Sequence, residues 1–414
     1  MNINKKLLVV AIASTLTACA GQSTSSSSEP AAANDMAPAK SSMASKHVTM
    51  SGPAPLAPLA SRKMGYAPDN KYSKAKSELG KMLFFDPRLG GDASVSCASC
   101  HDPEQGWAWA EDFSRGYPGT VHWRNSQTII NSQYLGKQFW AGGAASGEKQ
   151  AKSAATGAVA GNGESDIMEA RLALIPEYRK RFNDVFGDEW PLIGNAWRAI
   201  AVFEKELVQT DTPLDKYLEG DKAALSAEQV RGKALFEGKA GCIQCHNGAL
   251  TSDEKYYNIG VPTAPRWEED GLAQITFRYE LYAKGMTQKD YRTTKDDPGF
   301  YFRTKNAWDK GKFRTPSLRY TMYTAPYMHN GAFYSLEEVV DFYNRGGFNE
   351  DGKTTSFPKN KTSMIKPLGL SDNEKADLLA FIEAFSGDEI AIDKPDLPKY
   401  ARLFSEKELK EAKK

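Results

Sequence analysis

The sequence predicts an all-α fold in which two similar domains follow one another and carry long loops. Apolar residues recur with a helical period in several stretches, most clearly over residues 167–186 and 193–207. No convincing run alternates apolar and polar residues, as a half-buried strand would. An internal repeat supports the tandem arrangement, because Gly-Lys-Met-Leu-Phe at residues 80–84 returns as Gly-Lys-Ala-Leu-Phe at residues 232–236. Each copy is expected to end a helix that leads into a cysteine-containing loop.

Both loops contain the pattern C-x-x-C-H, which is the attachment site of a c-type haem. Each thiol of such a pair bonds one vinyl group of the porphyrin, and the adjacent histidine ligates the iron. A zinc site or a disulfide pair is the alternative, but zinc sites rarely place histidine directly after both cysteine pairs. We therefore predict two covalent haem c groups, held by Cys97, Cys100 and His101 and by Cys242, Cys245 and His246.

Capping signals locate further helices and one domain boundary. Ser226 with Gln229 forms a capping box that opens the second copy of the repeat. The same signal opens helices at Ser335 and Ser371, and glycines 346 and 347 end the first of these. The predicted segments are a signal peptide (1–18), a tether rich in Ser, Ala and Pro (19–62), an N-terminal domain (63–225), a C-terminal domain (226–395) and a charged tail (396–414).

The first residues predict export and a lipid anchor. Two lysines precede an apolar run over residues 7–13, which is too short to span a bilayer and is typical of a signal peptide. The run leads to Leu-Thr-Ala-Cys, which resembles a bacterial lipobox and makes Cys19 the expected lipidated residue. An ordinary cleaved signal peptide is the alternative. Since Ala20 and not aspartate follows, the resemblance favours a periplasm-facing protein on the outer membrane of a Gram-negative bacterium.

Composition narrows the function classes. The 414 residues carry a formal net charge of +1, so the protein lacks the excess of basic residues that is typical of nucleic-acid-binding proteins. The five cysteines are the two motif pairs and Cys19, which leaves none for a structural disulfide. Covalent haem is attached outside the cytoplasm, in agreement with an oxidising compartment. The long polar stretch over residues 261–297 is expected to be an insertion or a lid.

Over about residues 65–390 the sequence resembles the bacterial di-haem cytochrome c peroxidase and MauG family. The resemblance implies two all-α haem domains, one of which meets hydrogen peroxide while the other passes electrons to it. Besides the two haem motifs, it is carried by Phe139-Trp140, by Gln150 and by residues 313–319, 324–331 and 335–340.

For the N-terminal haem, the resemblance implies that His101 is the proximal ligand of the peroxide-binding iron. Trp140 matches the tryptophan that relays electrons between the two haems, and Gln150 matches the distal glutamine that orients peroxide. His122 could cap the open face of this iron or could be a surface histidine. The removable histidine of peroxidases aligns better with Tyr117, which favours an open or differently capped iron.

One position departs from the family pattern. The distal glutamate of the peroxidases falls on Ala160, and alanine cannot move a proton between the two oxygens of peroxide. Glu164 could take over this role if the glycine-rich loop before it is rearranged, or it could be a solvated surface charge.

For the C-terminal haem, His246 is the implied proximal ligand and the sixth ligand decides the chemistry. The peroxidases place a methionine on the helix after the capping box, and the alignment puts Tyr343 there. Met328 or Met364 is the alternative ligand. Thioether sulfur stabilises ferrous iron, whereas an anionic phenolate favours higher oxidation states. The tyrosine forms one stripe with three apolar residues at helical spacing, Leu336, Val339 and Val340.

We therefore expect a MauG-like haem-dependent oxidoreductase, in which both haems share high-valent iron and a partner protein is oxidised. The alternatives are a classical peroxidase that takes electrons from a small cytochrome or cupredoxin, and a non-enzymatic electron-transfer lipoprotein. The expected partners are peroxide and an electron-donor protein, which could carry an oxidisable Trp or Tyr, and the resemblance allows a homodimer. It also implies Ca²⁺ between the haems, bound by the Asn125 side chain and the Thr324 and Pro326 carbonyls.

Overall fold

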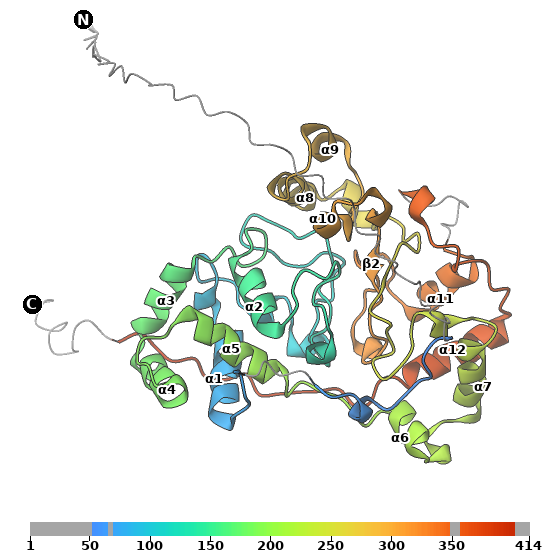
Figure 1. The fold of residues 1–414 in the computed structure, drawn as a ribbon, viewed down its shortest axis with the longest axis horizontal. Helices are drawn as coiled ribbons and strands as arrows, with labels where there is room; N and C mark the ends of the chain where they lie inside the picture. The colour runs from blue at the N-terminus through green and yellow to red at the C-terminus, as the bar shows by residue number, and fades with distance from the viewer. Residues whose placement is uncertain (1–51, 65–68, 348–356, 402–414) are drawn as a thin grey trace, which may run out of the picture. The chain divides into compact units, whose positions relative to one another are not determined.

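The computed structural model describes residues 52–64, 69–347 and 357–401, and Figure 1 shows the course of the chain. The described residues belong to one compact unit. The predicted signal peptide, the lipidation site Cys19 and most of the predicted tether lie outside the described residues, as does most of the charged tail.

Helices dominate the described part of the chain, which confirms the all-α prediction. Its one two-stranded sheet pairs β1 (Tyr256–Tyr257) with β2 (Phe313–Arg314) in antiparallel register. The first half contains α1 (Lys74–Phe85), α2 (Gly147–Thr156), α3 (Ser165–Ala173), α4 (Pro176–Phe186) and α5 (Ile193–Glu204). The second half contains α6 (Pro213–Glu219), α7 (Ala227–Glu237), α8 (Gly271–Ala283), α9 (Gln288–Thr293), α10 (Tyr301–Thr304), α11 (Leu336–Asn344) and α12 (Asp372–Glu383).

The expected single helical stretch over residues 167–186 is two helices. α3 ends at Ala173, and α4 begins at Pro176, which occupies the first helical position. Proline is favoured at that position because its missing N–H would have no intrahelical partner there, whereas inside a helix it removes a hydrogen bond. The capping boxes expected at Ser226, Ser335 and Ser371 are all present and open α7, α11 and α12.

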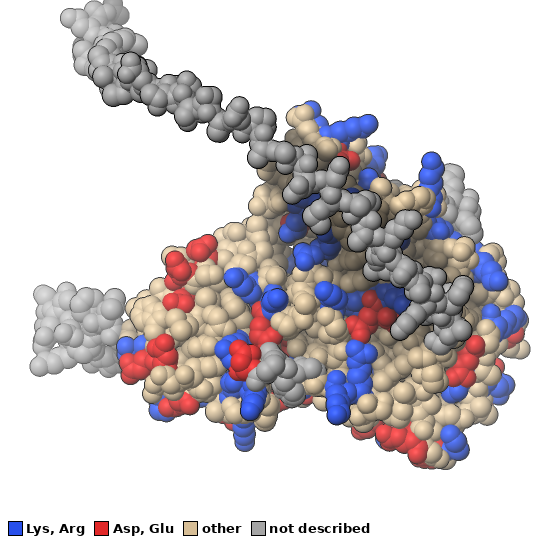
Figure 2. All heavy atoms as spheres, viewed as in Figure 1, with Lys and Arg blue, Asp and Glu red and all other residues tan. Residues whose placement is uncertain are grey.

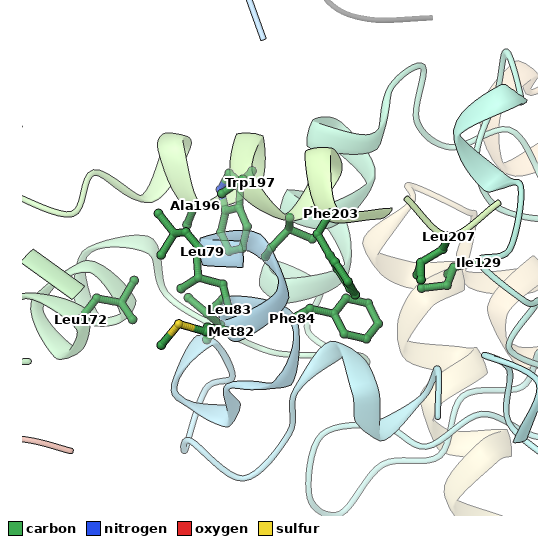
Figure 3. Close-up of a cluster of buried hydrophobic side chains, with 14 of the residues drawn as sticks. Leu79, Met82, Leu83, Phe84, Ile129, Leu172, Ala196, Trp197, Phe203 and Leu207 are labelled. Carbon is green, nitrogen blue, oxygen red and sulfur yellow. The ribbon is translucent and has the colours of Figure 1, made fainter. Parts of the chain in front are cut away.

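The first hydrophobic core lies where α1 packs against α5, and Figure 3 shows the side chains that meet there. Leu79 and Leu83 of α1 are fully buried against Ala196 and Phe203 of α5. The rings of Phe84 and Phe203 lie 5.5 Å apart, in the range of favourable aromatic pairs.

The second core repeats this arrangement with α7 and α12. Phe236 of α7 occupies the place of Phe84 in the repeated sequence, and its ring lies 5.4 Å from that of Phe381. These two helix pairs hold the two largest hydrophobic clusters of the described chain.

The repeated glycine has a packing reason. A Cβ on Gly80 would overlap the carbonyl of Ala199, and a Cβ on Gly232 would overlap the carbonyl of Asp377. Only glycine lets the two helix backbones of each half approach this closely. The repeat at residues 80–84 and 232–236 thus marks one helix crossing that occurs twice.

Residues after α12 return to the first half of the molecule, as the red trace in Figure 1 shows. The carbonyl of Ile390 accepts a hydrogen bond of 2.8 Å from the buried indole of Trp107. Farther along, the carbonyl of Pro398 accepts one of 2.8 Å from Arg88. This strap, residues 387–401, closes the first core although it follows the second core in sequence.

The stretch over residues 261–297, expected to be an insertion or a lid, contains α8 and α9 and leads into α10. Its inner residues Phe277, Leu281 and Met286 pack in a small cluster with Trp123 and Phe302, which lie outside the stretch. In the described ranges no helix has the length and apolar character needed to cross a bilayer.

We expect Gly232→Ala to destabilise the protein, because the new methyl group forces α7 and α12 apart. Overpacking of this kind costs about 1–3 kcal/mol. The matched control is Gly194→Ala in α5, where a Cβ meets nothing within 4 Å. Urea unfolding of the holoprotein measures both, and an unchanged midpoint for Gly232→Ala would contradict the role of this glycine.

Candidate functional site

The two C-x-x-C-H loops have the same backbone turn. Each starts with a short 3-10 helix, Cys97–Ser99 or Cys242–Gln244. The histidine N–H then bonds the carbonyl of the first cysteine, at 3.0 Å in the first loop and 2.9 Å in the second. The turn brings both thiols and the imidazole of each loop to the wall of one cavity. None of these four cysteines is in a disulfide.

The two motif histidines are held in the same tautomer. Nδ1 of His101 lies 3.3 Å from the carbonyl oxygen of Trp107, and Nδ1 of His246 lies 3.2 Å from that of Thr251. A carbonyl only accepts hydrogen bonds, so Nδ1 carries the proton and Nε2 keeps its lone pair for a metal. Burial lowers the pKa of His101 to about 4 and also lowers the pKa of His246, which keeps both rings neutral.

Two cavities adjoin these loops, one of about 660 Å³ at the first loop and one of about 570 Å³ at the second. Both volumes are typical of cofactor sites. Apolar side chains make up much of their walls, among them Phe84 and Ile129 in the first cavity and Leu378 and Ile382 in the second, and polar side chains are interspersed. Paired free thiols, a neutral imidazole and an apolar cavity fit a haem in each half.

Trp140 lies on the wall that both cavities share. Its indole Nε1 donates a hydrogen bond of 2.9 Å to the carbonyl of Asn125, and its own carbonyl accepts one of 2.9 Å from the Arg314 N–H. The first bond orients the indole ring, and the second holds the backbone of the same residue. The side chain lies on the wall that separates the two candidate haem sites.

Tyr343 stands on the inward face of α11 and also lines both cavities. Burial raises the pKa of its phenol, and the nearby thiols of Cys242 and Cys245 raise it further. Within the described chain its hydroxyl makes no hydrogen bond, so the oxygen remains available to a ligand. Of the alternative ligands, Met328 lines both cavities, whereas Met364 lines the second cavity alone and is 42% exposed.

The expected distal residues separate into two groups. Gln150 of α2 lines the first cavity together with Ala160. Glu164 does not line it: the side chain is exposed and accepts a 3.1 Å hydrogen bond from the N–H of Ser165 at the N-terminus of α3. The expectation that Glu164 reaches the cavity is therefore corrected, because its carboxylate satisfies a helix N-terminus instead.

His122 lines the first cavity and stacks on Trp123, with ring centroids 4.3 Å apart. Its Nδ1 accepts a 3.1 Å hydrogen bond from the Arg124 N–H, which places the ring proton on Nε2. Burial lowers the pKa of His122 to about 3, so the ring stays neutral. In this arrangement Nε2 is not free to ligate an iron. Tyr117 is not part of the cavity wall.

The three residues expected to bind calcium all line the first cavity. The Asn125 amide nitrogen donates to the carbonyls of Trp109 and Glu111, the latter at 2.9 Å, which leaves its side-chain oxygen for another partner. Thr324 directly precedes the cis peptide bond that joins Ala325 to Pro326. The described residues contain no cluster of three acidic, His or Cys ligands, so calcium here would rest on neutral oxygens.

Sequence reasoning missed Glu204, at the C-terminal end of α5. It lines the first cavity, is 4% exposed and accepts a 2.5 Å hydrogen bond from the Gln133 side chain. Burial raises its pKa to about 8. The available signal was a glutamate that directly follows the apolar run over residues 199–203.

Comparison with known proteins was consistent with this geometry. The model of the family described as di-haem cytochrome c peroxidase matches residues 74–223. The chain is 53% identical over 347 residues to cytochrome-c peroxidase IdrP1 of Pseudomonas sp. (strain SCT), covering 83% of this chain and 89% of the relative. It is 33% identical over 330 residues to the methylamine utilization protein MauG of Methylorubrum extorquens, covering 80% and 83%. A crystal structure of a MauG-like protein associated with microbial copper homeostasis superposes with a TM-score of 0.65 at 29% identity, over 81% of this chain and 93% of that one.

The raised pKa of Glu204 predicts a pH-dependent stability. The carboxyl is protonated in the folded protein at pH 7, whereas in the unfolded chain it ionises near 4.5. Its contribution to the free energy of unfolding is therefore fully present below about pH 4.5. That contribution is lost as the pH rises towards about 8. Glu204→Gln keeps the shape without titrating, so we expect its stability relative to wild type to rise over this window, by a few kcal/mol at most.

Urea unfolding of the holoproteins at several pH values measures this difference. Glu206→Gln, at an exposed position two residues away, is the control and should follow the wild-type pH profile. Parallel profiles of wild type and Glu204→Gln would contradict a protonated buried carboxyl.

Proposed function

Because the chain belongs to the di-haem cytochrome c peroxidase family, we propose that it is a MauG-like oxidoreductase, which uses hydrogen peroxide to oxidise a protein or another redox partner. A haem-dependent oxidoreductase with two haems is the coarser function common to this family. The observation that carries the finer proposal is the placement of Tyr343, and not a methionine, on the inward face of α11 in the second cavity.

We assign the two haems to the two cavities, each attached through both motif thiols and ligated by Nε2 of His101 or His246. When bound, they supply redox-active iron that reacts with peroxide on the first side and carries electrons on the second. The hydrogen bonds from Nδ1 to the Trp107 and Thr251 carbonyls orient both rings for this role.

On the peroxide side, the amide of Gln150 would hold the bound peroxide by hydrogen bonding. Trp140 would conduct electrons between the two sites, because it lines both cavities and its indole is held by the hydrogen bond to the Asn125 carbonyl. Neither Ala160 nor Glu164 supplies the proton-transferring carboxyl of the peroxidases. We therefore expect the protein to reduce peroxide less rapidly than those enzymes.

At the second site, the phenol of Tyr343 would hold the haem iron together with His246, since both line the same cavity. A buried phenol ionises only when a positive charge faces it, and ferric iron supplies that charge. The resulting anionic ligand stabilises oxidised iron, which suits an enzyme that holds two oxidising equivalents until its substrate arrives.

A classical cytochrome c peroxidase is the second candidate. Met328 lines both cavities, and a thioether in place of the phenolate would give a high-potential haem that accepts electrons from a small donor protein. One relative named cytochrome-c peroxidase is 53% identical to this chain, which favours this second candidate. The residue that supplies the sixth ligand, Tyr343 or Met328, distinguishes the two candidate functions.

The remaining parts of the proposal concern location and calcium. We propose a lipoprotein anchored through Cys19 that faces the periplasm, with residues 20–62 as a tether.

We also propose Ca²⁺ bound by Asn125, Thr324 and Pro326, since all three line the cavity beside Trp140 and the Asn125 side-chain oxygen is available.

We expect Tyr343→Met to raise the reduction potential of one haem and to abolish the spectral change that one equivalent of peroxide produces at both haems. The physical reason is the exchange of an anionic oxygen donor for a neutral sulfur. Redox titration and absorption spectra measure both effects. The control is Met328→Leu, which should leave the potential unchanged, and a loss of the ligand signature in this variant would favour the classical peroxidase.

We expect the double substitution Cys242→Ser and Cys245→Ser to remove one covalently attached haem while the first remains. Intact-mass measurement after denaturation counts the attached groups directly. The same pair of changes at Cys97 and Cys100 should have the same effect on the mass. Two haems retained in either variant would contradict thioether attachment at that loop.

A further inference from the structure

The repeated helix pair carries a carboxyl in the first half where the second half carries a hydrocarbon side chain. The phenylalanine of each repeat packs on Phe203 of α5 in the first half and on Phe381 of α12 in the second. The next residue is Glu204 in α5 and Ile382 in α12, and each lines the cavity of its own half. Hydrocarbon side chains are common at a buried wall, whereas a buried carboxyl is costly unless it is compensated. Glu204 is therefore a candidate for a chemical role in the first cavity.

The surroundings of Glu204 favour its protonated form. On the face drawn in Figure 2, acidic side chains lie at the surface, several of them beside basic ones. Glu204 is instead 4% exposed, and it accepts a hydrogen bond of 2.5 Å from the Gln133 amide. Burial raises its pKa to about 8, with a smaller contribution from the charge of Glu148, although Gln133 and Lys205 act in the opposite direction. The carboxyl therefore holds a proton at neutral pH.

Glu204 differs from the other carboxyl of the first cavity. Of the described residues that line this cavity, Glu204 and Glu280 are the two with a carboxyl group. Glu280 forms an ion pair of 3.2 Å with Lys284, directly after α8. His122 stays neutral, and a neutral imidazole is too weak an acid to give up its ring proton. The proton on Glu204 is therefore the one that this wall gives most readily to a bound molecule at neutral pH.

Glu204 lies close to two parts of the site already described. Burial, and after it the charge of Glu204, raises the pKa of the Cys97 thiol, so the carboxyl lies near the first motif loop. On another side its partner Gln133 packs against Gly147 of α2, the helix that carries Gln150. From its place on the wall, its burial and these neighbours we infer that Glu204 is the proton donor for peroxide reduction in the first cavity. The inference rests on the proposed function.

The proton and electron balance of the step is simple. Reduction of one hydrogen peroxide to two waters breaks the O–O bond and takes two electrons and two protons. The redox partner supplies the electrons by way of the second site. Glu204 gives one proton to the oxygen that leaves as water, and solvent supplies the second proton and afterwards restores the first. Glu204 thus supplies an acid that Ala160, at the position of the family's glutamate, lacks.

The first test follows the reaction of the holoprotein with one equivalent of hydrogen peroxide by stopped-flow absorption. Glu204→Gln keeps the side-chain shape and removes the acid, so we expect the rate constant to fall about 100-fold. The matched control is Glu280→Gln, at the other carboxyl of the wall, which should react at the wild-type rate. Carbon monoxide binds reduced haem without a proton, so all three proteins should bind it with the same affinity.

A second substitution separates proton donation from a structural role. Glu204→Asp retains an acid but shortens the buried side chain, so it should lower the urea midpoint more than Glu204→Gln does. We nevertheless expect Glu204→Asp to react with peroxide about tenfold faster than Glu204→Gln. A residue that only stabilised the fold would give the opposite order, with the more stable glutamine variant reacting faster.

The pH dependence gives a further measurement. We expect the wild-type rate constant to fall as the pH rises through about 8, because the carboxyl then loses its proton. The rate constant of Glu204→Gln should stay the same over this window. Infrared difference spectra of the resting holoprotein, recorded without peroxide on either side of this pH, should show the carbonyl stretch of a protonated carboxyl. That band should be present in wild type and Glu280→Gln and absent in Glu204→Gln.

The outcomes separate this inference from the function on which it rests. Equal peroxide rates for wild type and Glu204→Gln would overturn the inference alone, as would a Glu204→Asp variant that reacts more slowly than Glu204→Gln. A wild-type rate that does not change through this pH window would overturn it too. Failure of wild type to react with peroxide while both haems are attached would instead overturn the proposed function, whatever the infrared spectra show.

Discussion

Each half of this protein depends on one close contact between two helix backbones. In the first half Gly80 of α1 meets Ala199 of α5, and in the second Gly232 of α7 meets Asp377 of α12. The absence of a Cβ lets each pair cross, and a phenylalanine four residues later packs on a ring from the partner helix. The helix that carries each glycine precedes a cysteine loop in the sequence, closely after α7 and after a further 3-10 helix (Pro87–Leu89) in the case of α1.

The region between the two cavities depends on hydrogen bonds and buried charge. Trp140 bonds the backbone carbonyl of Asn125 and the backbone N–H of Arg314, which come from opposite halves of the sequence. Nearby, Arg319 and Asp215 form an ion pair of 2.7 Å with both side chains fully buried. Such a pair is sensitive to the loss of either partner, since the remaining charge would have no compensation. The backbone bonds to Trp140 and this ion pair both join residues that are far apart in the sequence.

The peroxide side shows how the chain differs from a standard peroxidase. Ala160 lacks a proton-transferring group and Glu164 is used at a helix N-terminus. A carboxyl does line the cavity, but it is Glu204, from α5, and burial keeps it protonated at neutral pH. The segment with α8 and α9 adds a wall to this cavity and places aromatic and basic side chains on the surface outside it.

The sequence by itself determined the all-α class, the two haem motifs, the repeat and the helix starts at Ser226, Ser335 and Ser371, because spacing and capping are local properties. It also indicated Trp140, Gln150 and Tyr343 through a resemblance, and the structure places all three on cavity walls. Only the tertiary structure decided that Glu164 turns away, that Glu204 faces the cavity and that the strap after α12 closes the first core. Those features depend on contacts between residues far apart in the chain, and no local pattern encodes which partner a buried carboxyl or a returning segment will meet.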